Sequence, residues 1–202
     1  MINTARSLRR AALAVALLNL AYFGVEFVVA LHIGSVSLFA DSIDFLEDAT
    51  INLLIVLAVG WSLRKRSAMG MLLAAAILVP GVATLWTAWQ KFMAPAAPAP
   101  VVLSATALGA LVVNLACAYI LARHRHGAGS LSKAAFLSAR NDAFANVAII
   151  GAGLVTLYTR NGWPDLIVGL AITAMNADAA REVFQAALRE RRAGERPSTG
   201  QP

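Results

Sequence analysis

Long apolar segments are the feature that most restricts the folds open to this chain. A helix needs about 20 apolar residues to cross the hydrocarbon core of a bilayer. Of the 202 residues, 59% are hydrophobic, against about 45–50% in a soluble domain. Six segments have the required length: Ala11–Ile33, Ser37–Ser62, Ser67–Trp89, Val101–Ala122, Leu131–Tyr158 and Asp165–Leu188. We therefore predict an all-α membrane protein with six transmembrane helices, in which 1–188 form the membrane domain and 189–202 a short, disordered polar tail.

Basic residues are distributed unevenly between the predicted loops. In a six-helix arrangement the arginine and lysine clusters all lie on one side, and the opposite loops carry only Lys91 and Arg160. Because cytoplasmic loops are enriched in basic residues, we expect both termini in the cytoplasm and the protein in the inner (plasma) membrane. The net charge of +6 then follows from topology, so we expect the lipid bilayer, and no nucleic acid, as a partner.

A short internal similarity relates the two halves of the chain. Leu18–Ala21 in the first predicted span is similar to Val113–Ala116 in the fourth, and each comes one span before a helix that carries aspartate. Two halves of three spans in opposite orientation would form an inverted 3+3 repeat.

Several carboxylates fall within the second apolar segment. Asp44 and Asp48 are four residues apart and share one face of a helix, with Asp41 on the same side. A carboxylate in hydrocarbon costs roughly 2.5–3.5 kcal/mol, and two like charges so close repel each other, so a bound cation or proton is expected to offset the cost. The alternative is a segment at the outer interface with its acids in water, which explains Asp41 better than Asp48.

The fifth apolar segment carries a second polar stripe. Ser138, Asp142 and Asn146 follow an i, i+4, i+8 spacing, with Asn141 at the edge of the stripe. If the second and fifth helices pack together, their aspartates can converge. An all-oxygen site with two or three carboxylates binds divalent cations. The alternative for Asp142 is a structural ion pair with Arg140.

The run Ser35–Asp48 resembles the second-span motif of the cation diffusion facilitator family. Members of that family are proton-coupled exporters of divalent metals. That motif has a metal ligand, three residues and then an aspartate, and Asp44 and Asp48 match it. The family's fifth span has a histidine or aspartate, three residues and an aspartate. Asp142 matches the aspartate, and Ser138 stands where the first ligand belongs. The resemblance extends over the whole six-span domain.

The resemblance implies a secondary active transporter that exports a divalent metal cation of the zinc, cadmium, cobalt, manganese or iron type in exchange for protons. No enzyme activity and no cofactor are expected, since the metal ion is the transported substrate. The implied metal ligands are Asp44, Asp48, Asp142 and Ser138, with Asp41, Asn141 and Asn146 as secondary candidates. Zinc favours nitrogen and sulfur ligands, so serine in place of an imidazole should relatively favour harder ions.

Two departures from the family pattern support an alternative. Ser138 is a weak ligand, and the chain stops soon after the sixth predicted span, whereas many family members continue into a cytoplasmic metal-binding domain. A short form of this kind would dimerise, if at all, through the membrane domain. The alternative function is therefore a non-transporting membrane partner that has kept the fold.

Glu26 is a further acid within the first predicted span. It could pair within the helical bundle, pair with an arginine or relay protons, and we favour a structural role. Asp165 is expected near the start of the sixth helix, where an acidic side chain complements the helix dipole.

Overall fold

A computed structural model describes residues 2–57, 82–123, 129–177 and 181 of the chain, and within these ranges the side chains of 2–6, 8, 55, 57 and 129–139 are outside the description. Regular structure in the described ranges is helical throughout, which confirms the all-α prediction. The labelled helices are α1 (Ile2–Ile33), α2 (Val36–Leu57), α4 (Pro100–Ala122) and α5 (Gly129–Thr159). Residues 82–93 and 163–177 are also helical.

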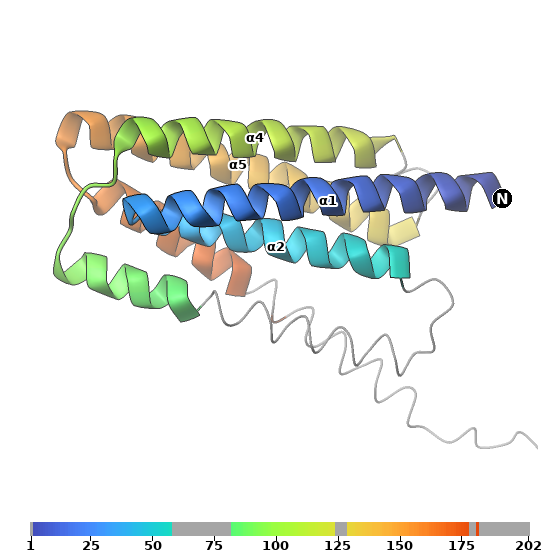
Figure 1. Ribbon diagram of the computed structural model, residues 1–202, viewed down its shortest axis with the longest axis horizontal. Helices are drawn as coiled ribbons and strands as arrows, with labels where there is room; N and C mark the ends of the chain where they lie inside the picture. The colour runs from blue at the N-terminus through green and yellow to red at the C-terminus, as the bar shows by residue number, and fades with distance from the viewer. Residues whose placement is uncertain (1, 58–81, 124–128, 178–180, 182–202) are drawn as a thin grey trace, which may run out of the picture.

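The four labelled helices pack in a ring, in which α1 contacts α2, α2 contacts α5, α5 contacts α4 and α4 contacts α1. Figure 1 shows these helices running side by side along the length of the molecule. The helical segments 82–93 and 163–177 lie near the same end of the bundle as the α1–α2 turn, to which both are bonded (Figure 1).

Three of the described helices are long and apolar enough to cross a membrane: Arg9–Ile33, Pro100–Ala122 and Arg140–Thr159. They correspond to the first, fourth and fifth spans expected from the sequence. Helix α2 has 22 residues, but four of them are acidic, which lowers its hydropathy. The orientation of the termini, the full set of six spans and the inverted repeat remain predictions.

The other predicted boundaries differ from the structure or extend beyond the described residues. Helix α2 begins one residue before the predicted Ser37, and 58–62 lie outside the described residues. Of the third predicted span only 82–89 is described, and its helix continues to residue 93 instead of ending at Trp89. This extension contains Lys91, which is buried and donates to the Gly34 carbonyl in the α1–α2 turn. The end of the sixth span and the tail are also outside the described part.

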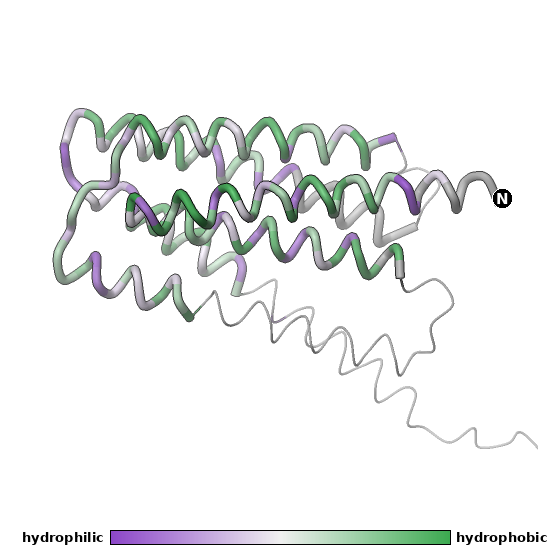
Figure 2. Tube along the Cα trace, viewed as in Figure 1, coloured by the Kyte–Doolittle hydropathy of each residue, from purple (hydrophilic) through white to green (hydrophobic). Residues whose placement is uncertain are grey.

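Apolar side chains divide between the bundle core and its outer surface. The core cluster contains buried residues from all four labelled helices, among them Ala30, Leu38, Leu103 and Ile149. Other large apolar groups face outward, and Val101 is 70% exposed. Figure 2 shows α4 as hydrophobic along most of its length. A helix that is apolar all round is typical of a membrane span, so these outward groups are suited to contact lipid.

The turn between α1 and α2 is formed around a glycine. Gly34 has φ +62°, a left-handed conformation that glycine adopts without a steric penalty. The Ser35 N–H donates to the Ala30 carbonyl at 3.0 Å, which is the Schellman pattern of a helix C-terminus. The chain therefore reverses within two residues and brings α2 directly against α1.

A buried aspartate attaches the helical segment 163–177 to the start of α2. Asp165 is fully buried and accepts hydrogen bonds from the Val36 N–H at 2.9 Å and from the Ser35 and Ser37 hydroxyls, each at 2.6 Å. It also forms an ion pair with Lys91 at 3.3 Å. Asp165 lies in the first turn of its own helical segment, as expected, but its carboxylate satisfies the free N–H groups at the N-terminus of α2. Three separate elements are thus joined at one carboxylate.

Gly169 allows the helical segment 163–177 to approach α2 closely. A Cβ atom at this position would lie 2.7 Å from the Val36 carbonyl carbon and 2.8 Å from the Ser37 nitrogen. We expect Gly169→Ala to lower stability by about 1–3 kcal/mol, as overpacking does elsewhere. The measurement is the thermal unfolding midpoint of the purified protein in detergent.

Gly24→Ala is the matched control for this prediction. Gly24 also lies within a helix, but a Cβ atom there would meet nothing within 4 Å. Because alanine has a higher helix propensity than glycine, this variant should melt at or above the wild-type midpoint. A Gly169→Ala midpoint as high as that of Gly24→Ala would contradict the prediction.

Candidate functional site

A cavity of about 150 Å³ lies between α2, α5 and the helical segment 163–177. Four of its seven lining residues are acidic. The lining consists of Asp44, Glu47 and Asp48 from α2, Asn141 and Asp142 from α5, and Met175 and Asn176 from the helical segment 163–177.

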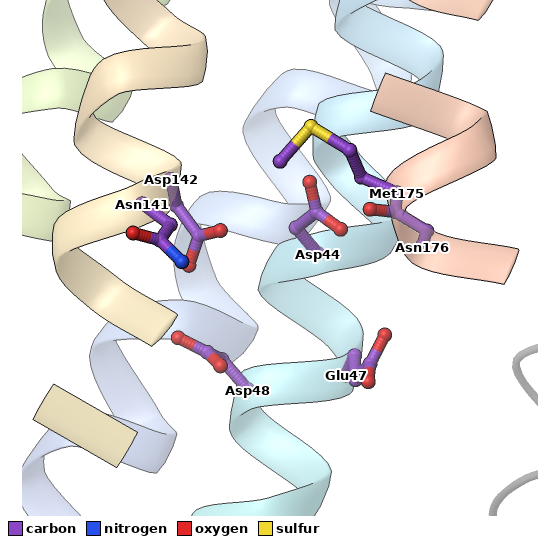
Figure 3. A pocket seen from close by; sticks show the side chains of 7 residues that line it. All are labelled: Asp44, Glu47, Asp48, Asn141, Asp142, Met175 and Asn176. Atoms are coloured by element: carbon purple, nitrogen blue, oxygen red, sulfur yellow. The ribbon is translucent and has the colours of Figure 1, made fainter. Parts of the chain in front are cut away.

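The acidic side of the cavity follows from the spacing of carboxylates along α2. Asp44 and Asp48 are one helical turn apart and both line the cavity, as the sequence analysis predicted for one helical face. Figure 3 shows Asp48 pointing from α2 towards α5, whereas Glu47 points away from α5. Asp48 is 5% exposed. Two α2 carboxylates therefore line the cavity beside α5, Asp48 buried and Asp44 partly buried.

Helix α5 contributes Asp142 and Asn141 to the opposite wall. Figure 3 shows the Asp142 side chain extending from α5 into the space before α2. The exposed Arg140 donates to the Asn141 side-chain oxygen at 3.4 Å. Within the described ranges Arg140 forms no ion pair with Asp142. The structural ion pair considered for Asp142 in the sequence analysis is therefore not formed.

The helical segment 163–177 forms the third wall of the cavity, with two residues that were not predicted from the sequence. Met175 and Asn176 come from the helical segment 163–177, and the Asn176 side-chain amide donates to the Ala40 carbonyl of α2 at 3.2 Å. An asparagine near the end of an apolar span is a weak signal by itself. Its position beside Asp44 depends on the packing of a segment more than 130 residues away in the chain.

Glu47 was also missed as a lining residue. It lies three residues after Asp44, which is close to one helical turn and could have been recognised from the spacing alone. Glu47 is 8% exposed. With it the cavity has four carboxylates, and none of the lining residues is a lysine, arginine or histidine. The site is thus strongly acidic and suited to cations.

The carboxylates surround the cavity without forming a closed ligand set. Among the described side chains, no three from histidine, cysteine, aspartate and glutamate are close enough together to hold one metal ion. A cation that bound here would therefore have to draw Asp44, Asp48 and Asp142 inward. Because Asp44 and Asp48 lie on α2 and Asp142 lies on α5, such a site would link the two helices.

Ser138 lies on α5 one turn before Asp142. Its side chain falls outside the described part of the structure. Its contribution to a metal site therefore stays a prediction, as do the metal-ligand roles of the aspartates.

Asp41 and Asn146, two of the secondary candidates, do not line the cavity. The Asn146 side-chain amide donates to Asp41 Oδ2, and the Asn114 amide donates to Asn146 Oδ1 at 3.1 Å. All three side chains are buried. They form a polar connection between α2, α5 and α4 that is separate from the cavity lining. Of the secondary candidates, Asn141 alone lines the cavity.

Comparison with known proteins identifies one matching family. The family described as the cation efflux transmembrane domain matches residues 12–190. The match includes every residue that lines the cavity. No curated protein was found to match the chain.

Proposed function

The chain belongs to the cation efflux family, and from this premise we propose that it exports a divalent metal cation from the cytoplasm in exchange for protons. Membership of the family makes it a membrane protein that transports cations. The observation that carries the finer proposal is the acidic cavity between α2, α5 and the helical segment 163–177. Its carboxylates come from two helices, three from α2 and one from α5, so relative movement of α2 and α5 would bind and release an ion.

In this proposal Asp44, Asp48 and Asp142 bind the metal ion directly, and Ser138 is a fourth ligand from the turn before Asp142. Carboxylate oxygens are ligands that divalent cations prefer in proteins. Asn141 is the neighbouring side chain that could complete the coordination. Because the described carboxylates are not assembled into a ready ligand set, metal binding would draw α2 and α5 together.

The ligand set also bears on which metal is carried. Carboxylate, hydroxyl and amide oxygens are hard ligands, which suit manganese, iron(II) and magnesium. Zinc is bound best by nitrogen and sulfur ligands in tetrahedral sites, and Ser138 offers an oxygen in place of an imidazole. We expect transport across the zinc, cadmium, cobalt, manganese and iron group, with a relative shift towards the harder ions.

Proton exchange follows from the chemistry of the same carboxylates. A carboxylate must be deprotonated to bind a metal ion, so protons compete with the metal for the site. Release of the metal on the outer side would let protons bind in its place. Movement of helix groups around a site near the middle of the membrane would then return the protons to the cytoplasm.

The test is metal-driven proton movement in liposomes that contain the purified protein. We expect an imposed gradient of zinc or manganese to drive protons in the opposite direction, measured with a pH-sensitive dye trapped inside. Liposomes with the Asp48→Asn and Asp142→Asn double variant are the control and should show only the background leak. If zinc, cadmium, cobalt, manganese and iron all fail to drive protons through the wild-type protein, the alternative of a non-transporting membrane partner is favoured.

A further inference from the structure

The side chain of Asn176 brings a third structural element to the wall of the acidic cavity. Asn176 lines the cavity together with Asp44 and Asp48 of α2. Its side-chain nitrogen donates to the Ala40 carbonyl of α2 at 3.2 Å. In an α-helix the carbonyl of Ala40 also accepts the N–H of Asp44. Asn176 is therefore attached to the same helical turn that carries Asp44.

The side-chain oxygen of Asn176 is the polar atom that this hydrogen bond leaves for the cavity. An asparagine amide has N–H donors on its nitrogen and a carbonyl oxygen that accepts. Among the described residues no group donates to the Asn176 oxygen, and Figure 3 shows that oxygen on the side of Asp44. The oxygen of Asn141, the other cavity amide, already accepts from Arg140 at 3.4 Å. An amide oxygen and a carboxylate are both acceptors, so a cation between Asn176 and Asp44 would be attracted to both.

Three contacts along the helical segment 163–177 hold it against α2. Near the start of the segment, Asp165 accepts from the Val36 N–H at 2.9 Å. One turn further on, Gly169 lies so close to α2 that a Cβ atom there would be 2.7 Å from the Val36 carbonyl carbon. The bond from Asn176 to α2 is the third contact. The Asn176 oxygen is thus held in a fixed position relative to the carboxylates of α2.

We propose that Asn176 determines which metal the site prefers, by supplying an uncharged oxygen ligand that favours six-coordinate ions over zinc. This inference rests on the proposed function, because it adds a ligand to the same cavity. The three proposed aspartate ligands and Ser138 already amount to four ligands, which is the number that zinc takes in tetrahedral sites. Manganese and magnesium are held by oxygen ligands in octahedral geometry, so a further oxygen contributes more to their binding. The neighbouring Met175 offers a thioether sulfur, a soft ligand that does not suit these ions.

The experiment is isothermal titration of the full-length protein in detergent with manganese and, separately, with zinc. We expect Asn176→Leu, which removes the oxygen and keeps the size, to weaken manganese binding by about 10-fold or more, as losses around a metal site commonly do. Zinc binding should weaken much less. The matched control is Thr173→Val, since Thr173 lies one turn earlier on the same segment, donates to the Gly169 carbonyl at 2.7 Å and is not among the lining residues. This control should keep both affinities.

Asn176→Asp separates a ligand from a residue that only supports α2. Aspartate keeps an oxygen and adds a negative charge, but it loses the N–H that donates to Ala40. If Asn176 is a ligand, this variant should bind manganese at least as tightly as the wild type. If Asn176 acts only through its hydrogen bond to Ala40, Asn176→Asp and Asn176→Leu should weaken manganese binding alike, and that outcome would overturn the proposal.

The number of water molecules on the bound manganese ion gives a second readout, which a purely supporting role would not change. In Asn176→Leu the vacated ligand position is open to water, so electron spin echo spectroscopy in deuterated water should detect an additional bound water. An unchanged number of waters would contradict the proposal. If Asn176→Leu does not fold, Asn176→Ser takes its place in both measurements, because serine is too short to reach the ion. A wild-type protein that binds neither metal would refute the proposed function, whereas Asn176 variants that bind both metals as the wild type does would refute this inference alone.

Discussion

Asp142→Asn is expected to lower the affinity of the protein for its metal ion by about 100-fold or more, which corresponds to about 2.7 kcal/mol. Asparagine keeps the size of the side chain and one oxygen, but it removes the negative charge from the α5 wall of the cavity. Attraction between charges is strong in a site with little water, so the charge matters more than the shape. Isothermal titration with manganese and zinc, in detergent, measures the change directly.

The pH dependence of this affinity provides a second, independent result. Wild-type binding should weaken as the pH falls, because protons compete for the carboxylates. In Asp142→Asn one competing carboxylate is gone, so fewer protons are released on binding and the affinity should change less steeply with pH. Arg140→Gln, which changes an exposed charge on the same helix, is the control and should not lower the affinity. Equal affinities for Asp142→Asn and the wild type would remove Asp142 from the metal site.

Asp165→Ala is expected to have the largest effect on folding, about 3–5 kcal/mol, as when one partner of a buried ion pair is removed. The change leaves the buried Lys91 without its carboxylate. It also removes the acceptor for the Val36 N–H and for the hydroxyls of Ser35 and Ser37. Chemical denaturation in detergent micelles, with the yield of monodisperse protein, is the measurement.

A double-mutant cycle separates the ion pair from the hydrogen bonds. Asp165→Asn keeps oxygen and size, so it should be less destabilising than Asp165→Ala. The double variant Asp165→Asn, Lys91→Met should lose less stability than the sum of the losses in the two single variants, because the two residues interact directly. Strictly additive effects, or a loss under about 1 kcal/mol in Asp165→Ala, would show that this contact does not hold the three elements together.

Local sequence patterns predicted some features of the fold and of the cavity correctly. The helices α4 and α5 agree with the predicted spans to within two residues, because apolar length is a local property of the chain. The pairing of Asp44 with Asp48 on one face was likewise predictable from helical spacing. Family membership was recognised from the same motif and is shown by the match over 12–190.

Asp41 marks the point where helical spacing ceases to be sufficient. It lies on the same general side of α2 as Asp44, yet Asp44 lines the cavity whereas Asp41 is fully buried and accepts a hydrogen bond from Asn146 of α5. Spacing gives the direction of a side chain around its own helix. It does not say which residues of a neighbouring helix lie opposite each turn, and Asp41 lies opposite Asn146 whereas Asp44 shares the cavity with Asn141 and Asp142.

The amino-acid sequence alone was sufficient for the helical class, for the membrane character and for the two acidic positions on α2, since each depends on residues within one or two helical turns. Only the tertiary structure revealed that Met175 and Asn176 complete the cavity, that Asp165 joins the start of α2 to Lys91, and that Asn146 of α5 donates to Asp41. These contacts join residues far apart in the chain. Their formation depends on how whole helices pack, which no local pattern encodes.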